Sequence, residues 1–330
     1  MYRVLLVGGG GYVGAELQPF LASLGYAVRV YDTFWYSRGM WPKDSFLGRE
    51  HVEYIDGDVR DIAKLKTALK DVDYCIHLAC VSNDPSYELD PTFARDINYD
   101  AFQALIPILN NSELKRFIFA SSSSVYGIKE EPNVTEELSL EPLTDYSKYK
   151  VRCEELVQEQ IKPEITHTIL RPSTVCGYSR RQRFDLVVNI LTLSALQDGL
   201  IRVDGGGQYR PNLHIKDMLR SYARVLEADP ELVRGKVFNV AGQNLTVSDL
   251  ALMVRNVVGQ HVNIEYVPTI DARSYRVSGE LIAKTLGFTP EHSVQDAIFD
   301  LMSAYRAGKF GDTDWNEYYN LRRMKELLSS

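Results

Sequence analysis

Three features that would indicate a membrane or nucleic-acid partner are missing from this chain. No apolar run approaches the ~20 residues of a membrane-spanning helix. No basic run or Lys/Arg-rich helix pattern occurs, and the net charge is −7, which argues against nucleic acid as a partner. The chain opens directly on a strand pattern, without the charged and apolar regions of a signal peptide. We therefore expect a cytoplasmic protein that has no membrane partner.

Cysteine and histidine are also sparse. The four cysteines (Cys75, Cys80, Cys153 and Cys176) have no CxxC spacing, and the six histidines form no HxxxH pair. Disulfides, structural zinc and other metal sites are therefore not expected. The 330 residues are 45% hydrophobic and 25% charged, which suits one large or two moderate domains with a sizeable core.

The first residues combine a strand pattern, a glycine cluster and a helix pattern. Residues 4–7 are apolar, Gly8, Gly11 and Gly14 follow in GxxGxxG spacing, and residues 15–24 have helical periodicity. Gly8 allows the positive φ of a tight turn, Gly11 allows backbone to approach a pyrophosphate, and Gly14 allows close packing of helix on strand. The helix N-terminus then offers free N–H groups to phosphates. This arrangement predicts a dinucleotide site.

The second strand pattern, residues 27–31, ends at Asp32. An acidic residue about 20 positions beyond the glycines suits a ribose diol and repels a 2′-phosphate, so NAD is favoured over NADP. Asp32 could instead simply begin the next loop. Arg29 and Arg38 lie near it in sequence and could in principle receive a 2′-phosphate.

Strand and helix patterns alternate through the first half of the chain. Strands are expected at 51–55, 74–78, 116–120 and 166–170, and helices at 62–69, 91–110 and 148–160. This alternation predicts an α/β fold with a Rossmann-type, doubly wound parallel sheet in residues 1–171. Residues 172–330 should form mainly a smaller substrate domain. It is interleaved with the first, because a segment around 210–243 returns a strand (236–240) to the sheet. The tail beyond Asp312 is expected to form a terminal helix.

A group of side chains suited to proton transfer follows these strands. Tyr146 and Lys150 are four residues apart and share a helix face, where the ammonium would lower the phenol pKa and make Tyr146 a general base. Ser121 to Ser124 end a predicted strand and so lie at its ligand-binding edge. A serine hydroxyl there could hydrogen-bond the oxygen that Tyr146 deprotonates. Read alone, these residues could equally form a solvated helix face and a polar turn.

The motifs taken together resemble one family. They are GGGGYVG (8–14), YD (31–32), GDVRD (57–61), HLAC (77–80), SSSSVYG (121–127), YSKYK (146–150), LRPSTVCG (170–177), RPNLHIKD (210–217) and SYRVSGELIAKTLGF (274–288). In this order they resemble an extended short-chain dehydrogenase/reductase of the NAD-dependent epimerase/dehydratase group, which acts on nucleotide sugars. The resemblance spans nearly the whole chain.

The resemblance implies roles for individual residues. Tyr146 matches the catalytic base, Lys150 its partner on the nicotinamide ribose, and Ser122 the catalytic Ser/Thr. The cofactor would be contacted by Gly8, Gly11, Tyr12, Val13, Asp32, Arg38, Asp58, Val59, Leu78, Ala79 and Asn98, besides Tyr146 and Lys150. The substrate would be contacted by Ser82, Ser123, Thr174, Arg183, Arg210 and Arg273, with Arg210 and Arg273 matching arginines that bind the diphosphate. His77 is expected to pack behind the cofactor, and His214 and Asp217 to organise a strand-to-helix turn.

Two departures from the family pattern narrow the range of reactions that we expect of this chain. The Asp-Glu pair that follows the catalytic Thr in 4,6-dehydratases is replaced by Ser123 and Ser124, so elimination lacks an evident acid and base. Thr174 stands where sugar 4-epimerases often have Asn. Cys176 replaces a Tyr, and we expect a small buried residue there rather than a reactive thiol.

We therefore expect an NAD-dependent epimerase of a nucleotide-diphospho-sugar, acting at C4 through a transient keto-sugar. The alternatives are a nucleotide-sugar dehydrogenase or 4-keto-sugar reductase with net redox, and a non-catalytic NAD-binding regulator. The resemblance also implies a homodimer through helices at about 92–110 and 147–161. The apolar residues Phe93, Ile97, Leu105 and Ile108 are compatible with such an interface or with packing on the sheet.

Overall fold

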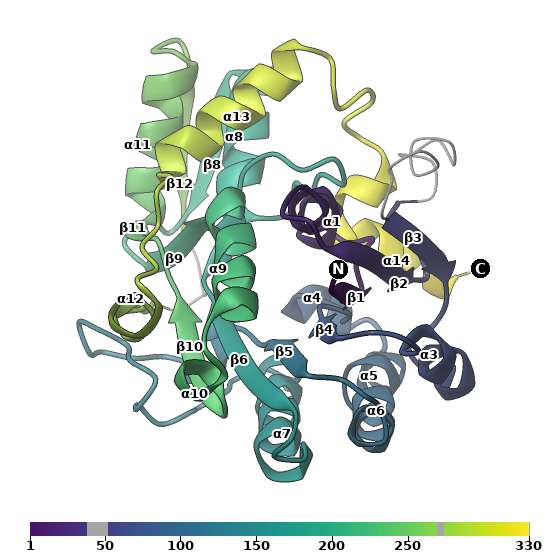
Figure 1. Cartoon of the computed structure of the whole chain (residues 1–330). Coiled ribbons are helices and arrows are strands. Elements are labelled where there is room, and N and C mark those ends of the chain that lie inside the picture. The colour runs from purple at the N-terminus through teal and green to yellow at the C-terminus, as the bar shows by residue number, and fades with distance from the viewer. Residues whose placement is uncertain (38–51, 269–273, 330) are drawn as a thin grey trace.

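The computed structural model describes residues 1–37, 52–268 and 274–329. Its centre is a seven-stranded parallel sheet, visible from its edge in Figure 1, with strand order β10-β6-β5-β4-β1-β2-β3. The strands are β1 (Arg3–Val7), β2 (Ala27–Asp32), β3 (Val52–Asp56), β4 (Tyr74–His77), β5 (Arg116–Ala120), β6 (Thr166–Pro172) and β10 (Lys236–Val240). The predicted doubly wound α/β fold is confirmed.

Helices cover both faces of this sheet and bury it in two apolar cores. One face packs against α3 (Ile62–Ala68), α5 (Pro91–Arg95), α6 (Ala101–Asn110) and α7 (Asp145–Gln160). The other packs against α1 (Gly14–Ser23), α9 (Ile215–Glu227), α10 (Pro230–Val233) and α12 (Glu280–Leu286). The inner strands are mostly apolar because both of their faces are covered, whereas the edge strand β3 is only partly buried.

A second group of elements packs around its own apolar core. It contains a three-stranded sheet of β7 (Thr174–Cys176), β9 (Tyr209–His214) and β11 (Gln243–Thr246), and a strand pair of β8 (Leu200–Asp204) and β12 (Asn263–Val267). The helices are α8 (Val187–Asp198), α11 (Val247–Val258) and α13 (Val294–Arg306). Between β9 and β11 the chain crosses back to the large sheet, where β10 pairs with β6, as expected for a returning segment. The domain division at residue 171 stays our proposal.

Two helices differ from the sequence expectation. The helix expected at 91–110 is divided into α5 and α6 by a π-helical turn, Asp96–Asp100. Helix α7 begins at Asp145 rather than at 148, because Thr144 Oγ1 accepts the backbone N–H of Ser147 over 3.3 Å and caps the helix. This cap was not predicted, although Thr is a favoured N-cap residue.

The chain end forms the expected terminal helix, α14 (Asn320–Leu328), after a 3₁₀ turn, Asn316–Tyr318. This helix lies away from α13 in Figure 1, and it packs against α4 (Asp84–Tyr87). Met324 is 1% exposed and belongs to the apolar core of the large sheet. The last residues of the chain therefore pack on the first domain.

The strand order of the large sheet indicates where a ligand-binding crevice lies. Strands β1 and β4 are neighbours. From β1 the chain passes through α1 to β2 on one side, whereas from β4 it passes through α4 (Asp84–Tyr87) and the following helices to β5 on the other side. In such sheets, ligands bind beyond the carboxyl ends of the strands at this switch point. Over the described ranges, no helix is both long and apolar enough to cross a membrane, and no group of three or more metal-binding side chains occurs.

Candidate active site

A cavity of about 590 Å³ opens at the carboxyl ends of the large sheet's strands. Sixteen of the sequence-predicted site residues line it: Gly8, Gly11, Tyr12, Val13, Asp32, Asp58, Val59, Leu78, Ala79, Ser82, Ser122, Ser123, Tyr146, Thr174, Arg183 and Arg210. Lys150 and Asn98 are buried behind its wall. The remaining two, Arg38 and Arg273, lie outside the described residues. One pocket therefore joins the proposed cofactor, catalytic and substrate residues.

The three glycines of the first turn differ in what surrounds them. Gly8 has φ +83°, and a Cβ there would lie 2.4 Å from the Ala79 backbone N. A Cβ on Gly14 would lie 2.5 Å from the Gly9 carbonyl O. A Cβ on Gly11 would meet no atom closer than 3.5 Å, yet Gly11 lines the cavity. Packing of the chain thus requires Gly8 and Gly14, while Gly11 leaves space open in the cavity, where binding of a pyrophosphate stays a prediction.

Asp32 ends β2 and lies in the cavity wall. Its carboxylate accepts the backbone N–H of Gly10 over 2.9 Å and that of Phe34 over 2.7 Å. Burial raises the pKa of Asp32, and these two hydrogen bonds oppose the increase. The two bonds fix a hydrogen-bond acceptor at the position where a ribose diol is expected, so this end of the pocket fits NAD.

Two further predicted cofactor contacts, Asp58 and Asn98, have partners within the protein. Asp58 pairs with Arg60 at 2.6 Å, and although burial raises its pKa, the hydrogen bonds from Arg60 leave the pKa below its ordinary value. Asn98 accepts the backbone N–H of Val81 over 2.7 Å and donates to its carbonyl over 3.0 Å. Asn98 therefore fixes the wall residue Val81, and direct contact of Asn98 with the cofactor stays a prediction.

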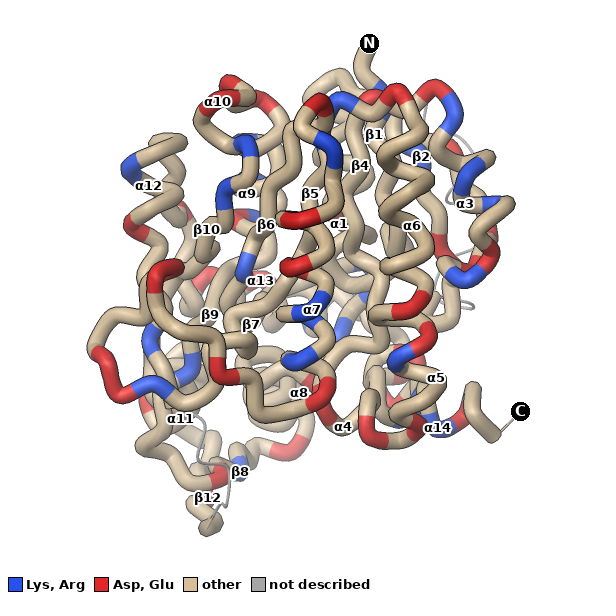
Figure 2. The backbone as a smooth tube through the Cα atoms, turned by 90° about the horizontal axis from the view of Figure 1, so that it is seen from below, with Lys and Arg blue, Asp and Glu red and all other residues tan. Residues whose placement is uncertain are grey.

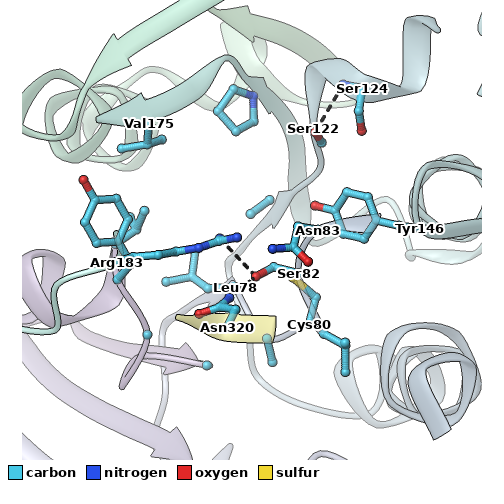
Figure 3. Close-up of a pocket in the computed structure, with 18 of the residues that line it drawn as sticks. Leu78, Cys80, Ser82, Asn83, Ser122, Ser124, Tyr146, Val175, Arg183 and Asn320 are labelled. Carbon is cyan, nitrogen blue, oxygen red and sulfur yellow. Dashed lines mark hydrogen bonds between the residues drawn. The ribbon is translucent and has the colours of Figure 1, made fainter. Parts of the chain in front are cut away.

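The proposed catalytic side chains come from two neighbouring elements (Figure 3). Ser122 follows β5 and caps the 3₁₀ turn Ser123–Tyr126, accepting the Ser124 N–H over 3.2 Å. Tyr146 lies in the first turn of α7 and lines the same cavity as Ser122. Lys150 lies one turn further along, with Nζ 5.9 Å from the Tyr146 ring centroid. Ser122 and Tyr146 therefore line one pocket, with Lys150 one helical turn from Tyr146, and the catalytic roles of the three residues stay a prediction.

The predicted lowering of the Tyr146 pKa is wrong for this structure. Burial raises the pKa of Tyr146 well above its usual range and Cys80 adds to the increase, whereas Arg183 and the nearby Ser122 hydroxyl lower the pKa without compensating. Lys150 Nζ donates to the Ala120 carbonyl O over 2.7 Å. The ammonium is thus held by a backbone oxygen and does not reach the phenol oxygen.

A chain of hydroxyl groups extends from the serine turn to a carboxylate. Ser147 Oγ donates to Ser124 Oγ over 3.0 Å and lies 3.0 Å from Thr144 Oγ1, which donates to Asp84 Oδ1 over 2.7 Å. All four side chains line the cavity. The cap that starts α7 is therefore connected to the wall that holds Ser122.

The opposite side of the pocket is a network of charged and amide groups that the sequence reading mostly missed. Arg183 donates to Asp185 and to Ser82 Oγ, over 2.5 and 3.2 Å. Arg181, which is 1% exposed, has its guanidinium 4.6 Å from the Tyr36 ring centroid, and burial lowers its pKa to about 10. The sequence offered one signal, the run of arginines at 180–183, of which Arg180 is exposed.

Three further expectations concern residues outside the reaction. Cys176 is fully buried in the core of the second domain, where burial raises its pKa to about 12, as expected of a packing residue. His77 is buried edge-on against Phe102 behind the pocket. His214 caps α9 through its Nδ1, and Asp217 accepts two backbone N–H groups from the 291–292 turn.

Comparison with known proteins agrees with this geometry. Residues 4–241 match the family described as the NAD dependent epimerase/dehydratase family. A UDP-glucose 4-epimerase of Lactobacillus helveticus is 26% identical over 325 residues, covering 90% of this chain and 94% of that protein. A dTDP-glucose 4,6-dehydratase of Streptomyces niveus is 25% identical over 318 residues, covering 92% of this chain and 93% of that protein.

A solved structure is similar over nearly the whole chain. The crystal structure of UDP-glucuronic acid 4-epimerase from Bacillus cereus, in complex with UDP-glucuronic acid and NAD, superimposes with a TM-score of 0.80. It is 25% identical and covers 92% of this chain and 99% of that chain. Since the family match also covers well over half of the sequence, this chain belongs to the NAD-dependent epimerase/dehydratase family and is an NAD-dependent enzyme of the extended short-chain dehydrogenase/reductase group.

Proposed function

We propose that the chain is an epimerase of a nucleotide-diphospho-sugar, acting at C4, with Tyr146 as the base. The observation that carries the proposal is the composition of the pocket around Ser122. Ser123 and Ser124, which also carry hydroxyl groups, follow Ser122 in the chain, and Tyr146 faces the same cavity. The pocket thus has a base for removing a hydroxyl proton, and serines at the positions where a dehydratase carries its acid and base.

In the proposed mechanism, Ser122 and Tyr146 bind the reacting sugar hydroxyl together. Tyr146 takes its proton as the carbon is oxidised. After the keto-sugar has rotated, hydride would return to the other face of the carbon, and Tyr146 returns the proton to the oxygen. NAD, when bound, takes up and gives back the hydride, and its positive ring charge favours the phenolate. Without such a charge, burial keeps Tyr146 protonated. Lys150 would hold the ribose of the cofactor.

Substrate recognition is assigned to pocket-wall residues of both proposed domains. Arg210 reaches the cavity from β9 and Thr174 from β7, while Arg183 and Ser82 face Tyr146 across the space shown in Figure 3. We assign Arg210 and Arg273 to the diphosphate, because a guanidinium binds phosphate oxygens in a bidentate manner. Ser82, Ser123, Thr174 and Arg183 are assigned to the sugar.

The relatives' names supply the substrates for the test. The purified protein is incubated separately with UDP-glucose, UDP-glucuronic acid and dTDP-glucose in deuterated buffer, and the products are identified by proton NMR. The proposal predicts the C4 epimer of one of them, with no net NADH absorbance at 340 nm and no deuterium on carbon, because the same hydride returns. A stable keto or deoxy-keto product, or stoichiometric NADH, would replace the proposal with net redox or elimination. No turnover of any compound would favour the regulator.

We also propose a homodimer through α6 and α7. In Figure 2 these helices lie side by side, and α6 contains no Lys, Arg, Asp or Glu. Leu105 and Ile97 are buried within the chain, so the outward side chains of α6 would form the contact. Light scattering after size exclusion should give twice the 37.5 kDa chain mass. An Ala104→Glu variant should give a monomer, and a wild-type monomer at micromolar concentration would refute the assembly.

A further inference from the structure

The first residue of the last helix lies in the wall of the active-site cavity. Helix α14 returns from the second domain to the first, and Arg323 on it donates to the Trp35 carbonyl over 2.7 Å. Asn320 lines the cavity, is only 4% exposed, and is drawn beside Ser82 and Arg183 in Figure 3. A residue from the far end of the chain thus completes the pocket.

Asn320 connects three segments that are distant in sequence. Arg181 Nη2 donates to Asn320 Oδ1 over 2.6 Å, and Asn320 Nδ2 donates to Ser82 Oγ over 2.8 Å. Its backbone N–H donates to Asp185 Oδ2 over 3.0 Å. The orientation of the amide is fixed, because a guanidinium can only donate hydrogen bonds and so requires the amide oxygen to face Arg181.

This amide determines which role the Ser82 hydroxyl can play. Ser82 Oγ accepts from Asn320 Nδ2 over 2.8 Å and from Arg183 Nη1 over 3.2 Å. A hydroxyl oxygen has two lone pairs and one hydrogen. With both lone pairs engaged, Ser82 is left with its hydrogen to donate, and it lines the cavity.

The neighbouring guanidinium offers a donor of the same kind. The Nε of Arg181 has no hydrogen-bond partner among the described residues, although the residue is 1% exposed and lines the cavity. A buried donor without a partner carries a desolvation cost, which a ligand acceptor removes. This side of the pocket therefore presents donors, from Ser82 and from two arginines, and its complement is an oxygen-rich anionic group.

We propose that Asn320 is a positioning residue that orients Ser82 and Arg181 as hydrogen-bond donors to a phosphate or carboxylate group of the bound ligand. The proposal rests on the proposed function only in taking that ligand to be either NAD or the nucleotide sugar. The C-terminal helix is then part of the binding site and not only a packing element.

The test is a double-substitution cycle read by calorimetric titration. In Asn320→Asp the side chain keeps its shape and its bond from Arg181, but it can no longer donate to Ser82 and instead accepts the hydroxyl hydrogen. Ser82→Ala removes the donor directly. We expect each variant to weaken one probe, NAD or UDP-glucuronic acid, about tenfold, as for one hydrogen bond to a charged group. Because Asn320 acts through Ser82, the two losses of affinity should not add. The double variant should therefore also bind that probe about tenfold more weakly than the wild type, and no more weakly than either single variant.

Comparing the two probes shows whether the anionic group belongs to NAD or to the nucleotide sugar, and both titrations measure binding without turnover. A loss confined to NAD assigns the donors to the cofactor pyrophosphate, and a loss confined to UDP-glucuronic acid assigns them to the sugar nucleotide. A failure to detect epimerase activity would therefore not affect the binding result. Once a substrate is known, KM should rise with kcat little changed. Lys325→Ala, on the exposed side of α14, is the matched control and should bind both probes as the wild type does.

Two results would overturn the proposal. One is a folded Asn320→Asp variant that binds both probes with wild-type affinity. The other is full additivity of the two substitutions, which would mean that Asn320 does not act through Ser82. Should Asn320→Asp fail to fold, unchanged affinity of Ser82→Ala for both probes is enough to refute it.

Discussion

Thr144 Oγ1 donates to Asp84 Oδ1 over 2.7 Å while accepting the backbone N–H of Ser147 over 3.3 Å. The cap of the helix that carries Tyr146 is thereby tied to the wall of the pocket. Replacing Thr144 by Val removes both bonds and should lower the free energy of unfolding by about 0.5–2 kcal/mol. Urea denaturation measures this, and turnover should fall as well because Tyr146 lies in the first turn. Thr144→Ser keeps the hydroxyl and should restore both properties, and a Val variant as stable as the wild type would contradict this role.

The base can be tested without disturbing the fold. Tyr146→Phe removes the phenol oxygen and should reduce turnover roughly 10²–10⁴-fold, the usual contribution of general acid–base catalysis. The affinity for NAD, measured by calorimetry, should change little because the ring is retained. A Phe variant with substantial turnover would remove Tyr146 from the proposed chemistry.

The glycine loop offers a matched pair of substitutions. Gly11→Ala adds a methyl group where the protein leaves room, so the melting temperature should stay near that of the wild type while NAD binds at least about tenfold more weakly. Gly14→Ala places the same methyl 2.5 Å from the Gly9 carbonyl O and should lower the stability of the apo protein by ~1–3 kcal/mol. If Gly11→Ala bound NAD normally, the pyrophosphate would have to lie elsewhere.

Acid should destabilise the protein through His77. Burial, followed by the charge of Lys150, lowers the pKa of His77 to about 3. Between the unfolded value of about 6.5 and this folded value, only the unfolded chain binds the proton. Stability is therefore full above pH 6.5 and falls as the pH drops towards 3, by up to about 1.4 kcal/mol per pH unit.

The comparison that isolates this effect is with His77→Phe, whose ring suits the contact with Phe102. Denaturation curves of both proteins between pH 7 and 4.5 should show a shallower loss of stability in the variant. Parallel curves would mean that His77 does not titrate in this way.

Local patterns were sufficient to predict the sheet and the strand ends that line one end of the pocket. The inner strands of the large sheet are rich in apolar residues. Gly8 directly follows β1 and Asp32 is the last residue of β2, so strand ends locate these two residues. The break between α5 and α6 gave no such signal, because apolar spacing continues through the π-helical turn.

The other wall of the pocket could not be predicted in the same way. Asn320 lies 139 residues from Arg181 and 238 from Ser82, and nothing near it in sequence indicates a site. Its position follows from the return of the chain end onto the first domain. The Tyr146 pKa was wrongly predicted for a related reason, since burial and the competing Ala120 carbonyl belong to the tertiary structure.

The central claim is that the chain recycles its own NAD. The most direct measurement is to purify the protein with no added nucleotide, denature it, and quantify the NAD and NADH released. An epimerase that returns each hydride to its substrate should release close to one cofactor per chain. A protein that is empty, but binds NAD when NAD is supplied, would exchange its cofactor at every turnover, and that result would contradict the epimerase in favour of a dehydrogenase or reductase.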